Sequence, residues 1–176
     1  MARIRASIAR VFQVVVLPPP HWMPNIEAFR RTHDPAFHRI GAHIVVVPAF
    51  EAENASLLTR FDAFSDADAF EVALGEPAAQ GRALCLPVTR GENDLRALES
   101  ALCVSLLGPL AAPREAAPAM RAGLFGGDAE LELARRVLAA MPPAEPFVVR
   151  TITLVLEDVR GLWHTVRERR LAARRA

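Results

Sequence analysis

The chain has 176 residues, 52% of them hydrophobic, and a formal net charge of +1. This apolar content is enough for a folded core, and the near-neutral charge excludes a protein that binds nucleic acid through bulk positive charge. All 21 basic residues are arginines. Arginine suits phosphate recognition, because its planar guanidinium can donate two parallel hydrogen bonds to a pair of oxygens.

The apolar runs predict neither a secretion signal nor a membrane span. The run that follows the basic N-terminus, Val14–Leu17, is shorter than a signal-peptide core, and no run is long enough to cross a bilayer. Cys85 and Cys103 lie in apolar segments and form no Cys-x-x-Cys pair, so we expect buried thiols and no metal site. We therefore expect a cytoplasmic protein without a cofactor or a membrane partner.

Runs of β-branched residues predict strands, and apolar residues at helical spacing predict helices. In chain order we expect a strand at 11–17, a helix at 26–32 with Asn25 as its N-cap, and a buried strand at 44–47 that Pro48 closes. Helices should follow at 52–64, 95–107 and 128–141, and strands at 70–74, 83–88, 147–156 and 166–171. Residues 75–82 read as a turn, and residues 109–123 show no clear periodicity.

These helices and hairpin-like strand pairs do not alternate as strict βαβ units, which favours an α+β fold. We expect residues 1–176 to form one domain, with a frayed tail over residues 172–176.

The most informative stretch runs from Asp34 to Phe50. His43 opens the apolar run Ile44–Val47, so we expect this histidine to lie at the mouth of a buried strand. An imidazole in that position can be held rigidly and can titrate near neutral pH.

The segment Ala42-His43-Ile44-Val45-Val46, followed by Pro48-Ala49-Phe50, resembles the first signature of the 2H phosphoesterase superfamily. This superfamily includes bacterial 2′-5′ RNA ligase-like proteins and cyclic nucleotide phosphodiesterases, and its members carry two His-x-Thr/Ser motifs. The resemblance covers about residues 10–171 in element order. It implies a two-lobed fold with antiparallel sheets around a central cleft that both motifs face. Here Val45 replaces the first hydroxyl residue.

In this family one histidine takes a proton from the attacking hydroxyl or water, and the other gives a proton to the leaving oxygen of a phosphodiester or cyclic phosphate. The motif hydroxyls hydrogen-bond the phosphate oxygens. Element order places the second motif between the helices at 95–107 and 128–141, where Pro118–Gly123 is the candidate. In that register Ala119 replaces the histidine, and Arg121 replaces the hydroxyl residue as the phosphate-binding group.

A second register over Thr151–Leu154 keeps a hydroxyl at Thr153 but has Thr151 where the histidine belongs. In either register His43 is the predicted catalytic residue, and the preferred register makes Arg121 the predicted substrate-binding residue. We expect a degenerate member that binds the phosphates of RNA ends or small cyclic nucleotides in a cleft at His43.

Two alternatives stay open. One is an active 2′,3′-cyclic phosphodiesterase in which a displaced histidine, His21, His38 or His164, completes the pair. The other is a scaffold or interaction protein whose cleft is vestigial.

Overall fold

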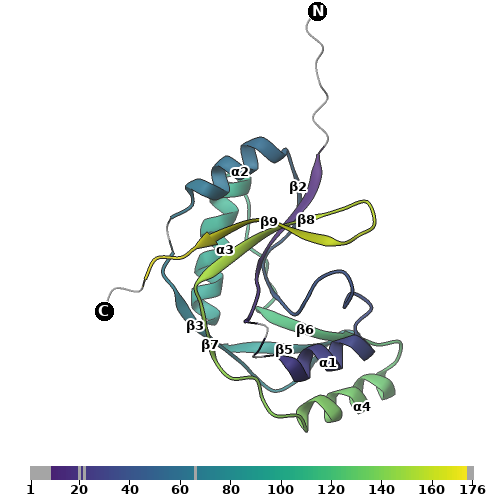
Figure 1. Cartoon of the computed structure of the whole chain (residues 1–176). Coiled ribbons are helices and arrows are strands. Elements are labelled where there is room, and N and C mark those ends of the chain that lie inside the picture. Colours follow the sequence, from purple (N-terminus) through teal and green to yellow (C-terminus); the bar gives the residue numbers. More distant parts are fainter. Residues whose placement is uncertain (1–8, 20, 22, 66, 174–176) are drawn as a thin grey trace, which may run out of the picture.

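The computed structural model describes residues 9–19, 21, 23–65 and 67–173. In chain order its elements are β1 (Arg10–Val16), α1 (Pro24–His33), β2 (Ile44–Ala52), α2 (Asn54–Ala63), β3 (Phe70–Leu74), β4 (Ala78–Gln80), β5 (Ala83–Arg90), α3 (Glu92–Leu107), β6 (Ala119–Leu124), α4 (Asp128–Ala139), β7 (Phe147–Val149), β8 (Thr151–Glu157) and β9 (Trp163–Arg170) (Figure 1). Every helix in this part of the chain is too short or too polar to cross a bilayer.

The strands form one antiparallel sheet in the order β7-β3-β5-β6-β2-β1-β8-β9, and β4 pairs with β5. We call β2, β1, β8 and β9 the first half-sheet, and β3 to β7 the second. The halves meet where β2 pairs with β6, at Ile44 and Met120. The α+β fold with antiparallel sheets is therefore confirmed, whereas the single-domain assignment of residues 1–176 stays a prediction.

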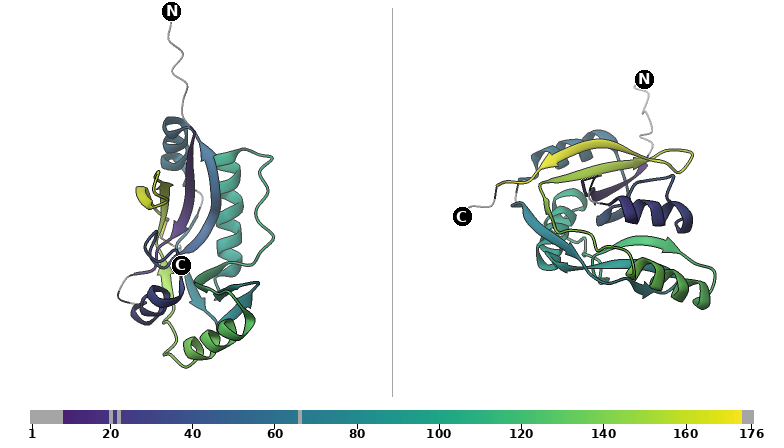
Figure 2. Two further views of the ribbon diagram at one scale, coloured as in Figure 1. Left: turned by 90° about the vertical axis from the view of Figure 1, so that its right-hand side faces the viewer. Right: turned by 60° about the horizontal axis from the view of Figure 1, so that its bottom comes forward.

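The helices cross between the two halves. Helix α1, which connects β1 to β2, packs against β6, and α3, which connects β5 to β6, packs against β2 (Figures 1 and 2). Figure 2 (left) shows α3 alongside β2 on one side of the sheet. The segments β1-α1-β2-α2 and β5-α3-β6-α4 thus repeat one pattern, and each half supplies a helix that covers the other.

Two element boundaries in the N-terminal half differ from the prediction, and each involves a proline, Pro48 or Pro24. Strand β2 continues past Pro48, because Pro48 lies within a register shift between the pairs Phe12↔Phe50 and Val14↔Val47, where a missing N–H is tolerated. Helix α1 begins at Pro24, with Met23 rather than Asn25 as its N-cap. Proline fits the first helical turn because the backbone N–H has no partner there.

The later departures involve short strands held by tertiary pairing. Residues 119–124, which show no periodicity, form β6 between β5 and β2, and the expected turn at 75–82 contains β4. The predicted strand 147–156 is divided at Arg150: β7 pairs with β3 and β8 pairs with β1, so the chain crosses here between the halves. Ala172 is not frayed, because its backbone bonds to Ala67 and Ala69; residues 174–176 lie outside the described part.

The junction of the two halves is buried. Ile44 and Met120 are both 0% exposed and belong to the hydrophobic core, which also includes Leu86 on β5. Since each strand of the junction presents alternate side chains to opposite faces, one face of β2 and β6 is committed to packing and the other is available for polar groups.

We expect Ile44→Ala to lower the free energy of unfolding by about 2–5 kcal/mol, because it leaves a cavity where the half-sheets meet. Val159→Ala is the control, since that side chain is fully exposed and its loss should change stability by no more than about 0.5 kcal/mol. Urea unfolding of both variants measures the difference. Equal effects of the two substitutions would contradict a structural role for the junction.

Candidate functional site

The guanidinium of Arg30 on α1 is buried, with 1% of the side chain exposed. Its Nε and Nη2 donate to Asp34 Oδ2 at 3.1 and 2.9 Å, and its Nη1 lies 3.3 Å from Glu27 Oε2. Nη2 also donates to the Ile40 carbonyl at 3.0 Å. Glu27, Arg30 and Asp34 have the three- and four-residue spacing that brings side chains together on one helix face. Their network fixes the loop that leads from α1 to β2.

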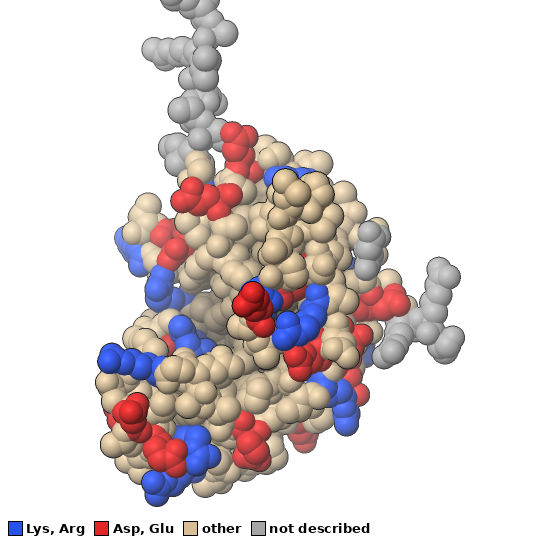
Figure 3. All heavy atoms as spheres, turned by 180° about the vertical axis from the view of Figure 1, so that it is seen from behind, with Lys and Arg blue, Asp and Glu red and all other residues tan. Residues whose placement is uncertain are grey.

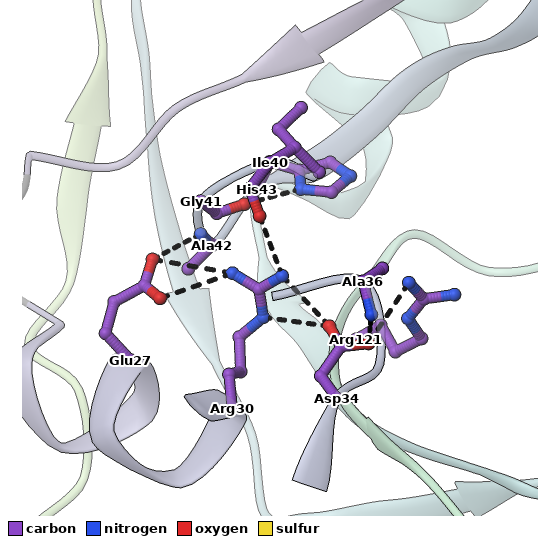
Figure 4. A network of polar contacts seen from close by, with 9 residues as sticks. All are labelled: Glu27, Arg30, Asp34, Ala36, Ile40, Gly41, Ala42, His43 and Arg121. Carbon is purple, nitrogen blue, oxygen red and sulfur yellow. Dashed lines mark hydrogen bonds and ion pairs between the residues drawn. The ribbon is translucent and has the colours of Figure 1, made fainter. Parts of the chain in front are cut away.

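Asp34 links this buried network to β6. Its Oδ1 lies 3.3 Å from Arg121 Nη2 and accepts the backbone N–H of Ala36 at 3.0 Å, while its Oδ2 binds Arg30. The Asp34 carboxylate is fully buried, whereas the Arg121 side chain is 43% exposed. Arg121 therefore has one end of its guanidinium anchored to the protein and still reaches the surface (Figure 4).

His43 lies directly before β2, as predicted. Its Nδ1 is 2.8 Å from the Gly41 carbonyl oxygen. Because a carbonyl only accepts hydrogen bonds, Nδ1 carries the proton, and Nε2 of the neutral ring keeps its lone pair. The preceding loop is held from behind, since the backbone N–H of Ala42 donates to Glu27 Oε1.

Partial burial lowers the pKa of His43 below its ordinary value of 6.5. The hydrogen bond from Nδ1 to Gly41 opposes this effect, the positive charges of Arg30 and Arg121 add to it, and Asp34 opposes it. The imidazole is therefore mainly neutral at pH 7, with Nε2 able to accept a proton or a hydrogen bond.

The register between β2 and β6 brings the two motif segments together. Ile44 lies opposite Met120, so in continued antiparallel register His43 lies opposite Arg121 and Val45 opposite Ala119. All four have their side chains on the face opposite the packed Ile44 and Met120. Figure 4 shows the His43 ring and the Arg121 guanidinium on the same side of the network. Strand order places Thr151 and Thr153 on β8, with β1 between β8 and β2.

Arg114, in the loop before β6, completes the surroundings of Val45. Its guanidinium donates to the Val45 carbonyl, and its backbone N–H donates to Glu99 Oε1 at 3.0 Å. Its Nε lies 3.4 Å from the same Glu99 oxygen.

The molecular surface is hollowed on the face seen in Figure 3, between the upper and lower parts of the view, and arginines lie at the rim of this hollow.

The three candidate histidines have different surroundings in the structure. His21 lines a surface pocket with Pro142–Glu145. His38 is exposed, and its ring lies edge-on to Phe37 with centroids 5.1 Å apart. His164 Nε2 is 2.9 Å from Asp158 Oδ2 on the β8–β9 hairpin.

Cys85 on β5 lies opposite Arg121. Burial raises the pKa of this thiol, against the opposing charge of Arg121, so it is a neutral neighbour of the site rather than a nucleophile. Cys103 is likewise a free, buried thiol. No group of three or more His, Cys, Asp or Glu side chains that could hold a metal ion occurs in the described ranges.

The sequence did not reveal the residues behind the site: Glu27, Asp34 and Arg30. The signal was present, because an acid, a base and an acid at positions 27, 30 and 34 predict ion pairs along one helix face. Arg114 had no comparable signal, since it lies in an irregular loop and its partner Val45 is far away in the sequence.

Two half-sheets joined at β2 and β6, each covered by a helix from the other half, have the architecture of the 2H phosphoesterase type. The model of the 2′-5′ RNA ligase superfamily matches residues 17–161, and the chain belongs to this family. Among curated proteins no significant match is found.

Solved structures show the same fold at low sequence identity. Escherichia coli LigT complexed with phosphate is 14% identical with a TM-score of 0.66, and the match covers 93% of this chain and 98% of LigT. LigT complexed with 3′-AMP is 15% identical with a TM-score of 0.67, covering 93% and 99%. A structure described as a phosphoesterase is 16% identical with a TM-score of 0.65, covering 94% and 99%.

We expect Arg30→Met to destabilise the protein by about 3–5 kcal/mol, because it leaves the buried Asp34 carboxylate without its main partner. Arg31→Met, at the next position on α1, is the control. Arg31 is exposed and lies 5.5 Å from the Phe37 ring, so its loss should cost no more than about 1 kcal/mol. Urea unfolding compares the two, and similar losses would contradict a special role for Arg30.

A histidine titration followed by NMR should place the pKa of His43 below 6.5. Arg121→Gln should raise this pKa, because it removes a positive charge that disfavours the imidazolium. Arg136→Gln, on α4, should leave it unchanged. A His43 pKa at or above 6.5 in the unmodified protein would show that the ring is more solvated than in this structure.

Proposed function

We propose that this chain binds the terminal or cyclic phosphate of RNA ends or small nucleotides between His43 and Arg121, and that it has lost the acid–base pair of its family. One observation carries the proposal: Ile44 pairs with Met120, so the next residues outward, His43 and Arg121, share the polar face of the β2–β6 junction. In the preferred register Ala119 stands where the family has its second histidine.

The phosphate would be held by charge and by hydrogen bonds. A guanidinium presents five N–H donors, and the contact with Asp34 uses only the Nη2 end of Arg121. Its remaining donors suit the oxygens of a phosphate, which binds arginine in a planar, two-pronged arrangement. An approaching anion raises the pKa of His43, so the ring becomes a second donor to the phosphate.

Hydrolysis through the family mechanism requires a second proton-transfer group across phosphorus from His43. Ala119 and Val45 carry only hydrocarbon side chains and can neither move a proton nor bind an oxygen. The LigT structures, whose bound molecules are phosphate in one and 3′-AMP in another, support phosphates as the ligand class for this fold. We place the protein in the cytoplasm, where its two free thiols would stay reduced.

Phosphate and 2′,3′-cyclic AMP should raise the melting temperature of the protein, because a ligand that binds only the folded state stabilises it by mass action. Arg121→Gln should weaken binding about tenfold or more, since hydrogen bonds to charged groups contribute about 1.5–3 kcal/mol. Arg136→Gln, which changes an exposed arginine on α4, is the control and should bind normally. Failure of both ligands to stabilise the protein would refute the proposal.

Turnover of 2′,3′-cyclic AMP distinguishes a binding protein from an enzyme. We expect no turnover above background by the unmodified protein or by His43→Ala. Turnover that disappears in His43→Ala would instead establish the active phosphodiesterase, with a second proton-transfer group that the motif positions do not supply.

A further inference from the structure

A pocket of 380 Å³ opens between α1, β5, the β3–β4 turn and the end of α4. Each of these helices and strands contributes an apolar side chain to its wall: Ile26 from α1, Leu86 from β5 and Leu138 from α4. A mostly apolar cavity with a few polar groups is typical of small-molecule sites, and this volume falls at the lower end of their range. The pocket shares no lining residue with the candidate phosphate site at His43 and Arg121.

The pocket lies on the side of the sheet opposite the candidate phosphate site. Leu86 pairs with Met120, and Met120 pairs with Ile44, so these three side chains point to the packed face. His43 and Arg121 each adjoin one of them in sequence and therefore point to the other face. A molecule in the pocket and a phosphate at His43 would thus occupy separate spaces.

The walls of the pocket are held in place by the backbone. On one side, the β3–β4 turn is fixed to β5, because the Gly75 N–H donates to the Pro87 carbonyl at 2.7 Å. A Cβ atom at residue 75 would lie 2.6 Å from Thr89 Cγ2, so a glycine allows the turn to approach β5 this closely. On the other side, Pro142 and Pro143 have fixed φ angles, which limits how far the segment after α4 can move into the pocket.

The polar groups of the pocket favour a cation. Of its lining residues only Glu76 and Thr89 have polar side chains, and none is basic. The Thr89 hydroxyl donates to the Ala73 carbonyl at 3.3 Å, so it already has a partner. Glu76 is exposed, and no basic side chain in the described part of the chain pairs with it. Its carboxylate therefore repels anions such as phosphate and attracts an ammonium group.

We propose that this pocket binds a small organic amine, with its apolar body among Ile26, Leu86 and Leu138 and its ammonium group at Glu76. The apolar body is favoured because the wall offers few hydrogen-bond partners to the water that it displaces. The ammonium group stays near the solvent at the rim, where the Glu76 carboxylate supplies the opposite charge. This ligand class differs from the phosphates proposed for the His43 site, and the pocket does not depend on that proposal.

Two probes of the same shape test the role of Glu76. Tryptamine carries an ammonium group on an indole body, and tryptophol carries a hydroxyl group in its place. NMR titration measures the affinities of both for the unmodified protein and for Glu76→Gln. The substitution should weaken tryptamine about two- to fivefold, the range of a partly exposed ion pair, and leave tryptophol unchanged. Glu51→Gln, which changes an exposed glutamate outside the pocket, is the control and should affect neither probe.

A second pair of variants tests where the probes bind. Ala139 lines the pocket from an exposed position, so Ala139→Trp should fill it and weaken both probes about tenfold or more. Ala140→Trp, at the next exposed position and outside the pocket, should change neither affinity. Inorganic phosphate should displace neither probe.

Four outcomes would overturn the amine pocket: no binding of either probe to the unmodified protein, equal effects of Glu76→Gln on the two probes, unchanged binding to Ala139→Trp, or displacement of the probes by phosphate. The first three place no amine in this pocket, and the last would place the probes at the His43 site instead. Absence of phosphate binding would refute the function proposed above and leave the amine pocket standing.

Discussion

The burial of one charged group, the Arg30 guanidinium, determines the path of the loop that leads from α1 to His43. A cation removed from water is tolerated only when carboxylates and carbonyls surround it, and here these come from Glu27, Asp34 and Ile40. Meeting that requirement bends residues 34–43 around the end of α1. Through Glu27 the same network holds Ala42, and through Asp34 it reaches Arg121. The orientation of the polar face at the junction thus depends on the buried charge of Arg30.

Side chains of β2 and β6 point alternately to the core and to the polar face, so different residues serve packing and the candidate site. Ile44 and Met120 face the core, and their burial maintains the union of the half-sheets whatever stands on the other face. The neighbouring positions 43, 45, 119 and 121 have their side chains on the other face, away from Ile44 and Met120. The packing at the junction therefore does not depend on which side chains stand at these four positions.

Sequence patterns predicted what depends on local order. The β-branched run after His43 and the apolar spacing of α3 and α4 were sufficient to place those elements. Strand β6 was not predictable from its own residues, because Ala119–Leu124 has little intrinsic strand preference and is held by β5 and β2. The position of Arg121 opposite His43 follows from strand register, which depends on tertiary pairing. Asp34, which pairs with Arg121, also binds the buried Arg30, and only the four-residue spacing of Arg30 and Asp34 is visible in the sequence.

The crossed helices have a consequence for how the protein comes to be folded. Helix α1 packs on β6, which is synthesised only after six further strands and helices, and the Arg39–Gly161 bond closes a separation of 122 residues. Since closing such long loops costs entropy before contacts offset it, topologies of this kind fold slowly. The first half-sheet also lacks β8 and β9 until the chain is nearly complete. On the ribosome, the N-terminal half would therefore emerge with an unpaired strand edge and an uncovered apolar helix, a state that depends on chaperones or on rapid completion of the chain.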